Sequence, residues 1–339
     1  MIGQTDVTIN AVLRCWGLAG VVETTPQLNQ GFSRSAVWRV RVGNERYALR
    51  RLTNELADAK HTCNTHRLMR YAGRVLNYVP WPRSTNDGPT VALCEGSFWS
   101  LESWLPGAPL SEVQIPAVEL ATTALWMFHE VTHDSHCFGE FAQQSPCGAV
   151  EQRHQLLRAW RDERHSSHMP SGCREDLVAR MQQIESQLPR AVGVALPVVE
   201  AARGEVVPQQ PILGDLRRGD LLFDAGRVTG LVDFGAAKID SPLVDLTRLL
   251  GELAGEQQQL WQAGLAAYQL HRQLTDTERR LIAALDAGGV VAASINWLRW
   301  LSEGTVKPSE AVLRRLGELL NRLEPLACGN LIAVRSIAP

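Results

Sequence analysis

Three aspartates stand around two short apolar stretches in the segment LGDLRRGDLLFDAGRVTGLVDFG, residues 213–235. Asp215 and Asp220 lie five residues apart in the loop DLRRGD, and the apolar run LLF follows them. The turn DAGR and a second apolar run then lead to Asp233. A hairpin of this length returns Asp233 to the side of the loop, so the three carboxylates are expected to converge. Because convergent carboxylates repel one another unless a cation neutralises them, the spacing predicts a metal site.

This set of groups suits phosphoryl transfer from ATP. Such a reaction needs a carboxylate that accepts or orients the attacking hydroxyl, and oxygen ligands that hold Mg²⁺ against the phosphates. It also needs cations that offset the charge of the transferring group. The plainer interpretation is an acidic hairpin on an unrelated α+β protein. The surrounding elements must decide between the two.

The N-terminal third of the chain has the pattern of strands with one helix. Within residues 31–52, alternation in SAVWRVRVGNERYALRRL predicts a hairpin that turns at GNE and follows the small polar loop NQGFSRSA. Residues 54–72 are typical of a helix with Asn54 as its N-cap. The segment VPWPRSTNDGPTVALCEGSFWSLESWLPG predicts two more strands around the turn NDG, and the break LPG marks a boundary.

Beyond this break the sequence becomes mainly helical. Periodicity predicts a helix over residues 112–133 and one or two amphipathic helices over 150–190. Pro197 and RGEVVPQQP are expected to form a linker before the acidic hairpin. Further helices are expected at residues 243–253, 256–272, 276–301 and 308–322. The fold class is therefore α+β with two lobes, a small strand-rich one over residues 1–105 and a larger helical one over 106–339.

The acidic segment resembles the catalytic segment of the aminoglycoside phosphotransferase, choline kinase and homoserine-kinase-like family, whose fold is that of protein kinases. The family pattern is approximately HGDLHxGNxLF, followed after a turn and a strand by D-[FW]-[GE]; here LGDLRRGDLLF and DFG stand in its place. The resemblance implies that Asp215 is the catalytic base and that Asp220 and Asp233 hold metal. SPLVDLTRLLG is similar to the family segment DPxxDLAxLL, in which Asp245 would brace the catalytic loop.

The resemblance covers about residues 30–302 and implies ATP and Mg²⁺ as cofactors. GFSRSAVWRV resembles the loop over the nucleotide phosphates, which implies phosphate contacts from Gly31, Ser33 and Ser35. YALRR resembles the third strand and places Arg50 where most kinases have a phosphate-binding lysine. FWSLESWLPG resembles the strand and hinge that meet adenine, through backbone groups from Glu102 to Trp104.

The catalytic loop departs from the family pattern at three positions. Leu213 replaces a histidine that buttresses the loop. Asp220 replaces an asparagine and adds a negative charge near ATP. Arg217 replaces a second histidine, at a position where many protein kinases have a lysine that faces the γ-phosphate. Arg217 is therefore expected to offset the charge of Asp220 and to take part in catalysis.

A fourth departure concerns the helix after the third strand. No acid occurs at residues 61–67, where the partner of Arg50 is expected, and Glu55 is the nearest candidate. Two interpretations follow from the resemblance. The preferred one is an ATP- and Mg²⁺-dependent phosphotransferase that acts on a hydroxyl of a small molecule. The alternative is a nucleotide-binding pseudokinase with a regulatory role.

A second motif suggests different chemistry. Residues 129–133 read HEVTH, a pattern in which two histidines chelate Zn²⁺ and Glu130 acts as general base. The continuation DSHCFGEF lacks the glycine and third histidine of metzincins, although Glu151 and Glu163 are possible distant ligands. The helix AVELATTALWMFHE resembles the family helix that ends in LH, in which His129 packs or forms a hydrogen bond. A zinc peptidase is therefore the third interpretation.

Composition agrees with a cytoplasmic small-molecule enzyme. The 339 residues carry a net charge of -2, which gives no reason to expect a nucleic-acid or membrane partner. The N-terminus has no signal-peptide pattern, and no run of about 18 apolar residues predicts a transmembrane helix. The seven scattered cysteines contain no CxxC pair, as is typical of reduced thiols.

The segment RHQLLRAWRDERHSSH is expected to form a solvated helix face or to line the acceptor cleft. It is not acidic, as a site for polycationic aminoglycosides should be. The sequence leaves the acceptor and the oligomeric state open.

Overall fold

The computed structural model of the chain describes residues 4–19, 21–26, 36–52, 56–162 and 174–337. The chain forms two compact units. The first comprises residues 1–110, 130–140 and 219–237, and the second comprises residues 111–129, 141–218 and 238–339. The strand-rich N-terminal region and largely helical C-terminal part confirm the predicted α+β class. The predicted lobe boundary near residue 105 stays a prediction.

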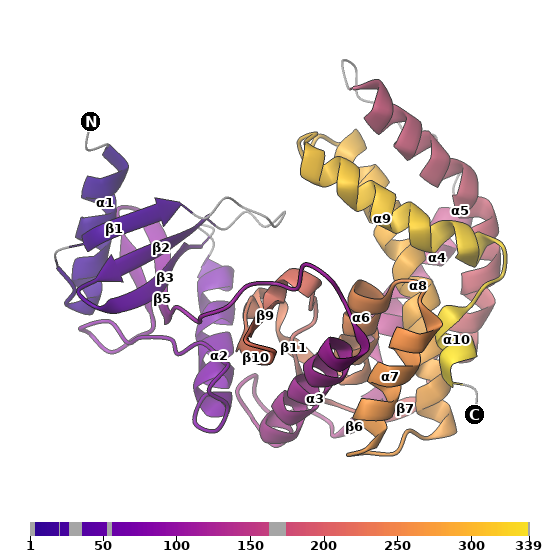
Figure 1. Ribbon diagram of the computed structural model, residues 1–339, viewed down its shortest axis with the longest axis horizontal. Coiled ribbons are helices and arrows are strands. Elements are labelled where there is room, and N and C mark those ends of the chain that lie inside the picture. Colours follow the sequence, from indigo (N-terminus) through magenta and orange to yellow (C-terminus); the bar gives the residue numbers. More distant parts are fainter. Residues whose placement is uncertain (1–3, 20, 27–35, 53–55, 163–173, 338–339) are drawn as a thin grey trace. The chain divides into compact units, whose positions relative to one another are not determined.

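The first unit is built on an antiparallel sheet of five strands in the order β1-β2-β3-β5-β4 (Figure 1). Its strands are β1 (Val21–Pro26), β2 (Ala36–Val42), β3 (Glu45–Arg51), β4 (Val91–Cys94) and β5 (Ser97–Ser103). The hairpin predicted within residues 31–52 is confirmed as β2 and β3, which turn at Gly43 with a φ of 59°. In this hairpin Arg50 pairs with Val37 across the two strands.

Two strands are present in the segment that was predicted to turn at NDG, but NDG does not connect them. Both β4 and β5 follow Asn86–Gly88, and they turn at Glu95 and Gly96 with φ values of 52° and 70°. Positive φ at both central residues matches the right-handed twist of a tight hairpin. The NDG prediction was therefore wrong, because a turn-favouring tripeptide also suits an irregular connection.

The N-terminal helix α1 (Gln4–Leu13) and the short helix η1 (Arg14–Trp16) supply apolar side chains to the core of the first unit. This core contains buried residues from both helices and from the sheet: Ile9, Val12, Leu13, Trp16, Val40, Tyr47, Leu49, Ala92, Trp99 and Leu101. Helix α2 (Leu56–Ala72), predicted at 54–72, buries Leu68 and Met69 on one face.

The acidic hairpin also belongs to the first unit. It consists of β9 (Leu221–Asp224) and β10 (Arg227–Leu231), followed by the short helix η3 (Phe234–Ala236). The backbone N–H of Leu231 donates to the carbonyl of Tyr78 at 2.7 Å. The N–H of Phe223 donates to the carbonyl of Ala108 at 2.8 Å. Because these bonds fix both strands, the hairpin that the sequence predicted has a defined position inside its unit.

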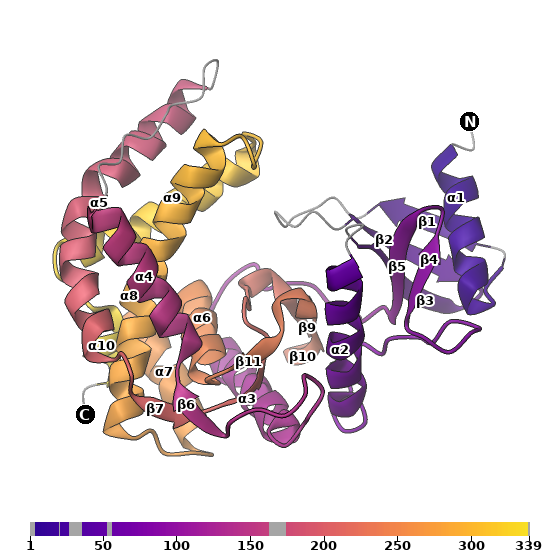
Figure 2. The same cartoon turned by 180° about the vertical axis from the view of Figure 1, so that it is seen from behind.

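The second unit is mainly helical. Its helices are α4 (Gly148–Asp162), α5 (Glu175–Ala201), α6 (Leu243–Ala254), α7 (Gln258–Gln269), α8 (Asp276–Ser302), α9 (Glu310–Ala327) and α10 (Ile332–Ile337), together with most of α3 (Ile115–Thr132). Short strand pairs join β6 (Gln144–Pro146) to β7 (Val206–Pro208) and β8 (Gln210–Ile212) to β11 (Lys238–Asp240). Helices α4 and α5 lie beside α8, as Figure 2 shows from behind.

The predicted linker was wrong at two points. Pro197 lies inside α5, which continues to Ala201. A proline interrupts one helical hydrogen bond, but α5 buries Val192, Leu196 and Val199 on one face, and this packing outweighs the loss. Most of residues 206–211, assigned to the same linker, lie in the short strands β7 and β8. The other predicted helices of this unit are present, and α9 runs five residues beyond its predicted end at 322.

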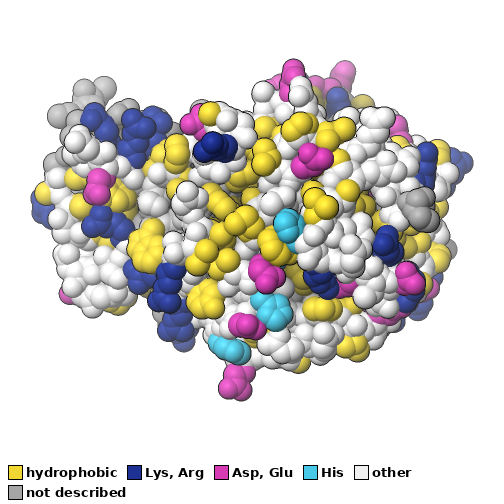
Figure 3. Space-filling view, turned by 60° about the horizontal axis from the view of Figure 1, so that its bottom comes forward, with side chains coloured by type: hydrophobic (Ala, Val, Ile, Leu, Met, Phe, Trp, Pro, Cys, Tyr) yellow, Lys and Arg dark blue, Asp and Glu magenta, His cyan; other side chains and the backbone are white. Residues whose placement is uncertain are grey.

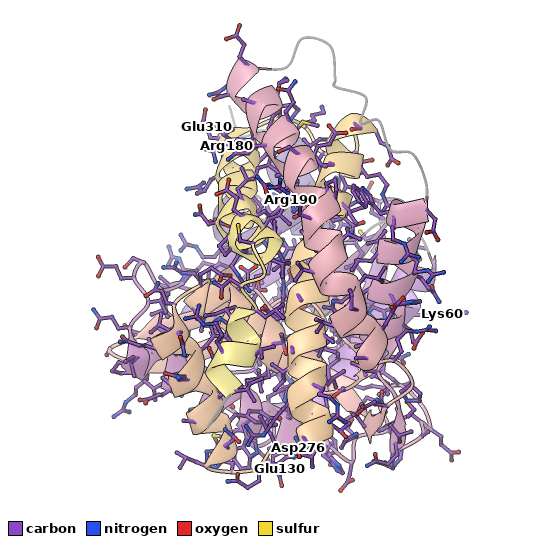
Figure 4. The ribbon with its side chains drawn as sticks, turned by 90° about the vertical axis from the view of Figure 1, so that its right-hand side faces the viewer. Lys60, Glu130, Arg180, Arg190, Asp276 and Glu310 are labelled. Atoms are coloured by element: carbon purple, nitrogen blue, oxygen red, sulfur yellow. The ribbon has the colours of Figure 1, made fainter. Side chains whose placement is uncertain are left out.

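Helix α8 is the centre of the second unit. In Figure 4, Asp276 at its start and Glu310 at the start of α9 lie at opposite ends of the helical group. By length and composition α8 could cross a membrane, but 72% of its most apolar window is buried. Burial of this extent identifies it as a core helix of its unit. Acidic, basic and hydrophobic side chains all occur on the face seen in Figure 3, in agreement with the small net charge.

Candidate active site

A buried carboxylate fixes the start of the predicted catalytic loop. Asp245, in the first turn of α6, is completely buried. It accepts hydrogen bonds from the N–H of Leu213 at 2.7 Å and the N–H of Gly214 at 2.8 Å. Nε2 of His129 lies 3.1 Å from Oδ2, the oxygen that also accepts from Leu213. Asp245 therefore braces the two residues that precede Asp215, as the resemblance implied.

The contact between His129 and Asp245 gives the first histidine of the HExxH motif a structural role. His129 is buried against Asp245, so its Nε2 is engaged within the second unit. His133 lies beyond the end of α3, is half exposed, and contacts Asp134 at 2.8 Å. Glu151 is paired with Arg203 at 3.0 Å, and Glu163 lies outside the described residues. Within the described parts of the chain, no three His, Cys, Asp or Glu side chains are grouped as a metal site.

Two arginines hold the side chain of Asp215. Arg217 donates to Oδ2 through Nη2 at 2.6 Å and Nε at 3.1 Å, and Arg248 of α6 donates to Oδ1 at 3.1 Å. Arg248 also lies 3.3 Å from Glu252, which Arg315 contacts at 2.9 Å. Burial raises the pKa of Glu252, but the charges of Arg248 and Arg315 outweigh it and leave that pKa below its ordinary value. Asp215, Arg248, Glu252 and Arg315 thus form a row of alternating charges, in which Arg248 and Glu252 lie on α6.

The first unit brings Arg50 and the other two aspartates together. Nη1 of Arg50 lies 3.7 Å from Oδ1 of Asp233. Asp233 has a φ of 62° and a ψ of 67°, a left-handed backbone that a non-glycine residue adopts only at a cost. The N–H of Val232 donates to the carbonyl of Asp220 at 2.8 Å, which places the two aspartates beside each other at the base of the hairpin. Carboxylate oxygens are the ligands that Mg²⁺ prefers, so this pair fits the predicted metal.

Residues 61–67 of α2 contain no acid, but a histidine in this stretch contacts an acid of the sheet. His66, in the stretch 61–67, is buried and lies 3.5 Å from the carboxylate of Glu102 on β5. Burial raises the pKa of Glu102, but the hydrogen bond from His66 and the charges of Arg50 and His66 lower it further than burial raises it. Helix α2 is also joined to the end of the hairpin, because Nε2 of His61 lies 3.0 Å from the carbonyl of Gly235. Imidazoles therefore make these two contacts of α2, and among the described residues the acid that contacts Arg50 is Asp233.

The structure describes only some of the other residues that were predicted to contact the nucleotide. The N–H of Trp104 donates to the carbonyl of Arg46 at 3.0 Å, and the guanidinium of Arg39 lies 5.6 Å from the centre of its ring. The adenine contacts predicted from Glu102 to Trp104 stay a prediction. Gly31, Ser33, Ser35 and Glu55 lie outside the described residues.

Comparison with known proteins gives the family. Residues 24–284 match the profile of the phosphotransferase enzyme family, which covers well over half of the chain. The chain belongs to this family. The phosphotransferase is also similar to solved structures. One is a spectinomycin phosphotransferase in complex with ADP and spectinomycin, with a TM-score of 0.68, 10% identity and coverage of 94% of this chain and 96% of that one.

Two further structures show the same fold. An aminoglycoside phosphotransferase from Alicyclobacillus acidocaldarius has a TM-score of 0.64 at 14% identity and covers 95% of this chain and 94% of its own. An amicoumacin kinase in complex with AMP-PNP, Ca²⁺ and amicoumacin has a TM-score of 0.65 at 11% identity, with coverages of 97% and 95%. At these identities the likeness shows the fold alone, and it confirms the protein-kinase-like architecture. No curated protein matches the sequence.

The sequence did not predict two residues of the phosphotransferase that contact predicted site residues. Arg248 contacts Asp215, and His66 contacts Glu102. The sequence held a signal for Arg248, because it lies three residues after Asp245 and so one helical turn along α6 from the bracing carboxylate. His66 gave no comparable signal, since its partner is distant in sequence.

Proposed function

We propose that this phosphotransferase transfers the γ-phosphoryl group of ATP, with Mg²⁺, to a hydroxyl of a small molecule in the cytoplasm. The observation that carries the proposal is the position of Asp215, next to two backbone N–H groups that the buried Asp245 holds. Family membership supplies the reaction class, and the rigid loop supplies a carboxylate at a defined place. The neighbouring structures solved with ADP or AMP-PNP and with antibiotics support a nucleotide donor and a small acceptor.

Asp215 is proposed as the catalytic base. Its side chain is 41% exposed, so an acceptor hydroxyl can approach it. The carboxylate would accept a hydrogen bond from that hydroxyl, orient it for attack, and take its proton as the new bond to phosphorus forms. Arg217 and Arg248 hold the two carboxylate oxygens and limit the orientations that Asp215 can adopt.

The nucleotide is proposed to bind through residues of the first unit. Asp220 and Asp233 would hold Mg²⁺, which neutralises phosphate charge when bound. Arg50, on the rigid strand β3, would turn from Asp233 to the α- and β-phosphates. Gly31, Ser33 and Ser35 would cover the phosphates, and backbone groups between Glu102 and Trp104 would meet adenine. Arg217 would contact the γ-phosphate.

One observation favours the alternative of a nucleotide-binding pseudokinase. In α2, His66 rather than an acid faces the sheet, and Arg50 is paired with the proposed metal ligand Asp233. An enzyme in this state must break the Arg50–Asp233 contact before both groups can serve a nucleotide. The exposed fraction of Asp233, 48%, makes this contact a weak one, because solvent screens it.

MgATP is expected to raise the melting temperature of the wild-type protein by several degrees, because a ligand that binds only the folded state stabilises it by mass action. At a nucleotide concentration of 100 times Kd the gain is about 2.7 kcal/mol. Differential scanning fluorimetry with ATP, with and without Mg²⁺, measures it. A zinc chelator is expected to change nothing. Stoichiometric zinc in the purified protein, together with no nucleotide shift, would contradict the proposed function.

Arg217 and Asp220 are expected to be energetically coupled, because they carry opposite charges three residues apart in one loop. Such charges interact by on the order of 2–4 kcal/mol at an effective dielectric constant of ~20. Arg217→His should weaken MgATP binding, Asp220→Asn should be mild, and the double variant should recover most of the loss. A double-mutant cycle on MgATP affinity measures the coupling. An interaction energy of zero would mean that Arg217 does not act on the phosphates.

A further inference from the structure

Arg153, in the second unit, has no acidic partner among the described residues. Arg153 lies in α4, which runs beside α8 (Figure 2). Its side chain passes over two consecutive glycines of α8. A Cβ atom at Gly288 would lie 3.1 Å from its Cδ, and one at Gly289 would lie 3.5 Å from its Nε. Glycine at both positions therefore leaves the space that the side chain of Arg153 occupies.

The acids around Arg153 are bound to other groups. In the described part of the chain, no carboxylate oxygen lies within 4.0 Å of its nitrogens. Asp240 accepts from the N–H groups of Gly148 at 3.1 Å and Ala149 at 2.9 Å. Asp286 accepts from Arg322 at 2.7 Å. Arg153 is only partly exposed, so its charge is partly desolvated, and no described carboxylate pairs with it.

A second arginine, Arg248, is close enough for its charge to act on Arg153. Burial lowers the pKa of Arg153, and the charge of Arg248 lowers it further, although Cys147, Asp240 and Asp286 act in the opposite direction. Arg248 is the residue that holds Asp215, at 3.1 Å. Its Nε is buried and has no hydrogen-bond partner among the described residues. Arg248 thus has unused capacity for a hydrogen bond next to the proposed base, and Arg153 lies on α4, which packs against the same helix α8 as the α6 helix that carries Arg248.

We propose that Arg153 and Arg248 bind an anionic group of the acceptor, so that the substrate is a hydroxyl compound with a carboxylate or phosphate group. This inference rests on the proposed role of Asp215 as the base. Guanidinium groups bind both kinds of oxyanion through paired N–H donors. A bound anion would satisfy the free donors and offset the repulsion between the two arginines. A polycationic aminoglycoside would meet the same arginines with like charge, which disfavours it.

Anion binding tests the inference without turnover. Inorganic phosphate and malonate, as a dicarboxylate, are titrated by calorimetry into the wild type, Arg153→Gln and Arg158→Gln. Arg158 is the matched control, because it lies on the same helix, is half exposed, and is paired with Asp162 and Glu200. The expected result is binding of at least one anion to the wild type and Arg158→Gln, and at least tenfold weaker binding to Arg153→Gln. The tighter anion distinguishes a phosphate from a carboxylate group on the acceptor.

Two results would overturn the inference. One is the absence of anion binding to the wild type. The other is binding that Arg153→Gln retains and Arg50→Gln loses, which would place the anion at the nucleotide phosphates instead. Folding is checked by thermal melting. Because Arg153→Gln removes an uncompensated charge, its melting temperature should equal or exceed that of the wild type, and Arg153→Lys should keep part of the binding.

Turnover measurements distinguish a failure of the anionic-acceptor proposal from a failure of the proposed phosphotransferase activity. Glycerate, glycerol 3-phosphate and kanamycin are compared as acceptors with MgATP in the wild type and Arg153→Gln. The expected result is turnover of an anionic acceptor, with KM for that acceptor raised tenfold or more in the variant and KM for ATP unchanged. Turnover of kanamycin that Arg153→Gln leaves unaltered would overturn the anionic acceptor alone. Arg153-dependent anion binding without turnover of any acceptor would overturn the proposed function and leave an anion site.

Discussion

Replacing Asp215 by asparagine is expected to reduce kcat by about 10²–10⁴-fold, because the variant lacks the carboxylate that we propose orients and deprotonates the acceptor hydroxyl. Affinity for MgATP should remain within a few-fold of wild type. Asp215 lies in the second unit, whereas Arg50, Asp220 and Asp233 belong to the first. The change also leaves the loop braced, since the contacts of Asp245 involve the backbone of Leu213 and Gly214.

Steady-state ADP release with a panel of small hydroxyl compounds measures turnover, and calorimetry measures MgATP affinity. Asp224→Asn is the matched control, because Asp224 is an exposed carboxylate at the end of β9 in the same segment, and its loss should change neither quantity. Turnover of Asp215→Asn within about threefold of wild type would exclude Asp215 as the base, given the size of general-base effects. A wild type without turnover, in which Asp233→Asn also binds ATP normally, would instead favour the pseudokinase.

Replacing Asp245 by alanine is expected to lower the free energy of unfolding by roughly 2–6 kcal/mol, because each buried donor left without a partner costs about 1–3 kcal/mol. Asp245 is fully buried and binds two backbone N–H groups, so both would lose their acceptor. His129 would lose its partner as well. Urea unfolding measures the change, and kcat should fall with it because the loop before Asp215 is no longer held.

Thr247→Val is the matched control for this prediction. Thr247 lies two residues further along α6 and is also buried, but its hydroxyl has no hydrogen-bond partner among the described residues. Its replacement by a side chain of similar shape should change stability by less than about 1 kcal/mol, since no partner is left unsatisfied. If Asp245→Ala costs no more than Thr247→Val, then the brace is not what positions the loop.

The sequence alone determined the type of fold and the candidate chemical groups. The spacing of Asp215, Asp220 and Asp233 around two apolar runs is a local property, because a short hairpin with a turn at Ala225 and Gly226 can join its ends in only a few ways. Periodicity likewise located most helices, since a buried helical face repeats every three to four residues. Local signals failed at Pro197 and at the NDG turn, where residues that favour breaks were accommodated by helix packing and by an irregular connection.

Tertiary structure decided which groups meet. Asp245 reaches the backbone of Leu213 across 32 residues of sequence, and His129 reaches Asp245 across 116. The contacts between Arg248 and Asp215, and between His66 and Glu102, depend on the same long-range packing. A charge without a described acidic partner, such as that of Arg153, cannot be identified from a sequence, because it is defined by which of the surrounding acids are already bound to other donors. Sequence patterns report local periodicity and residue type, whereas hydrogen-bond partners and desolvation are set only when distant segments pack together.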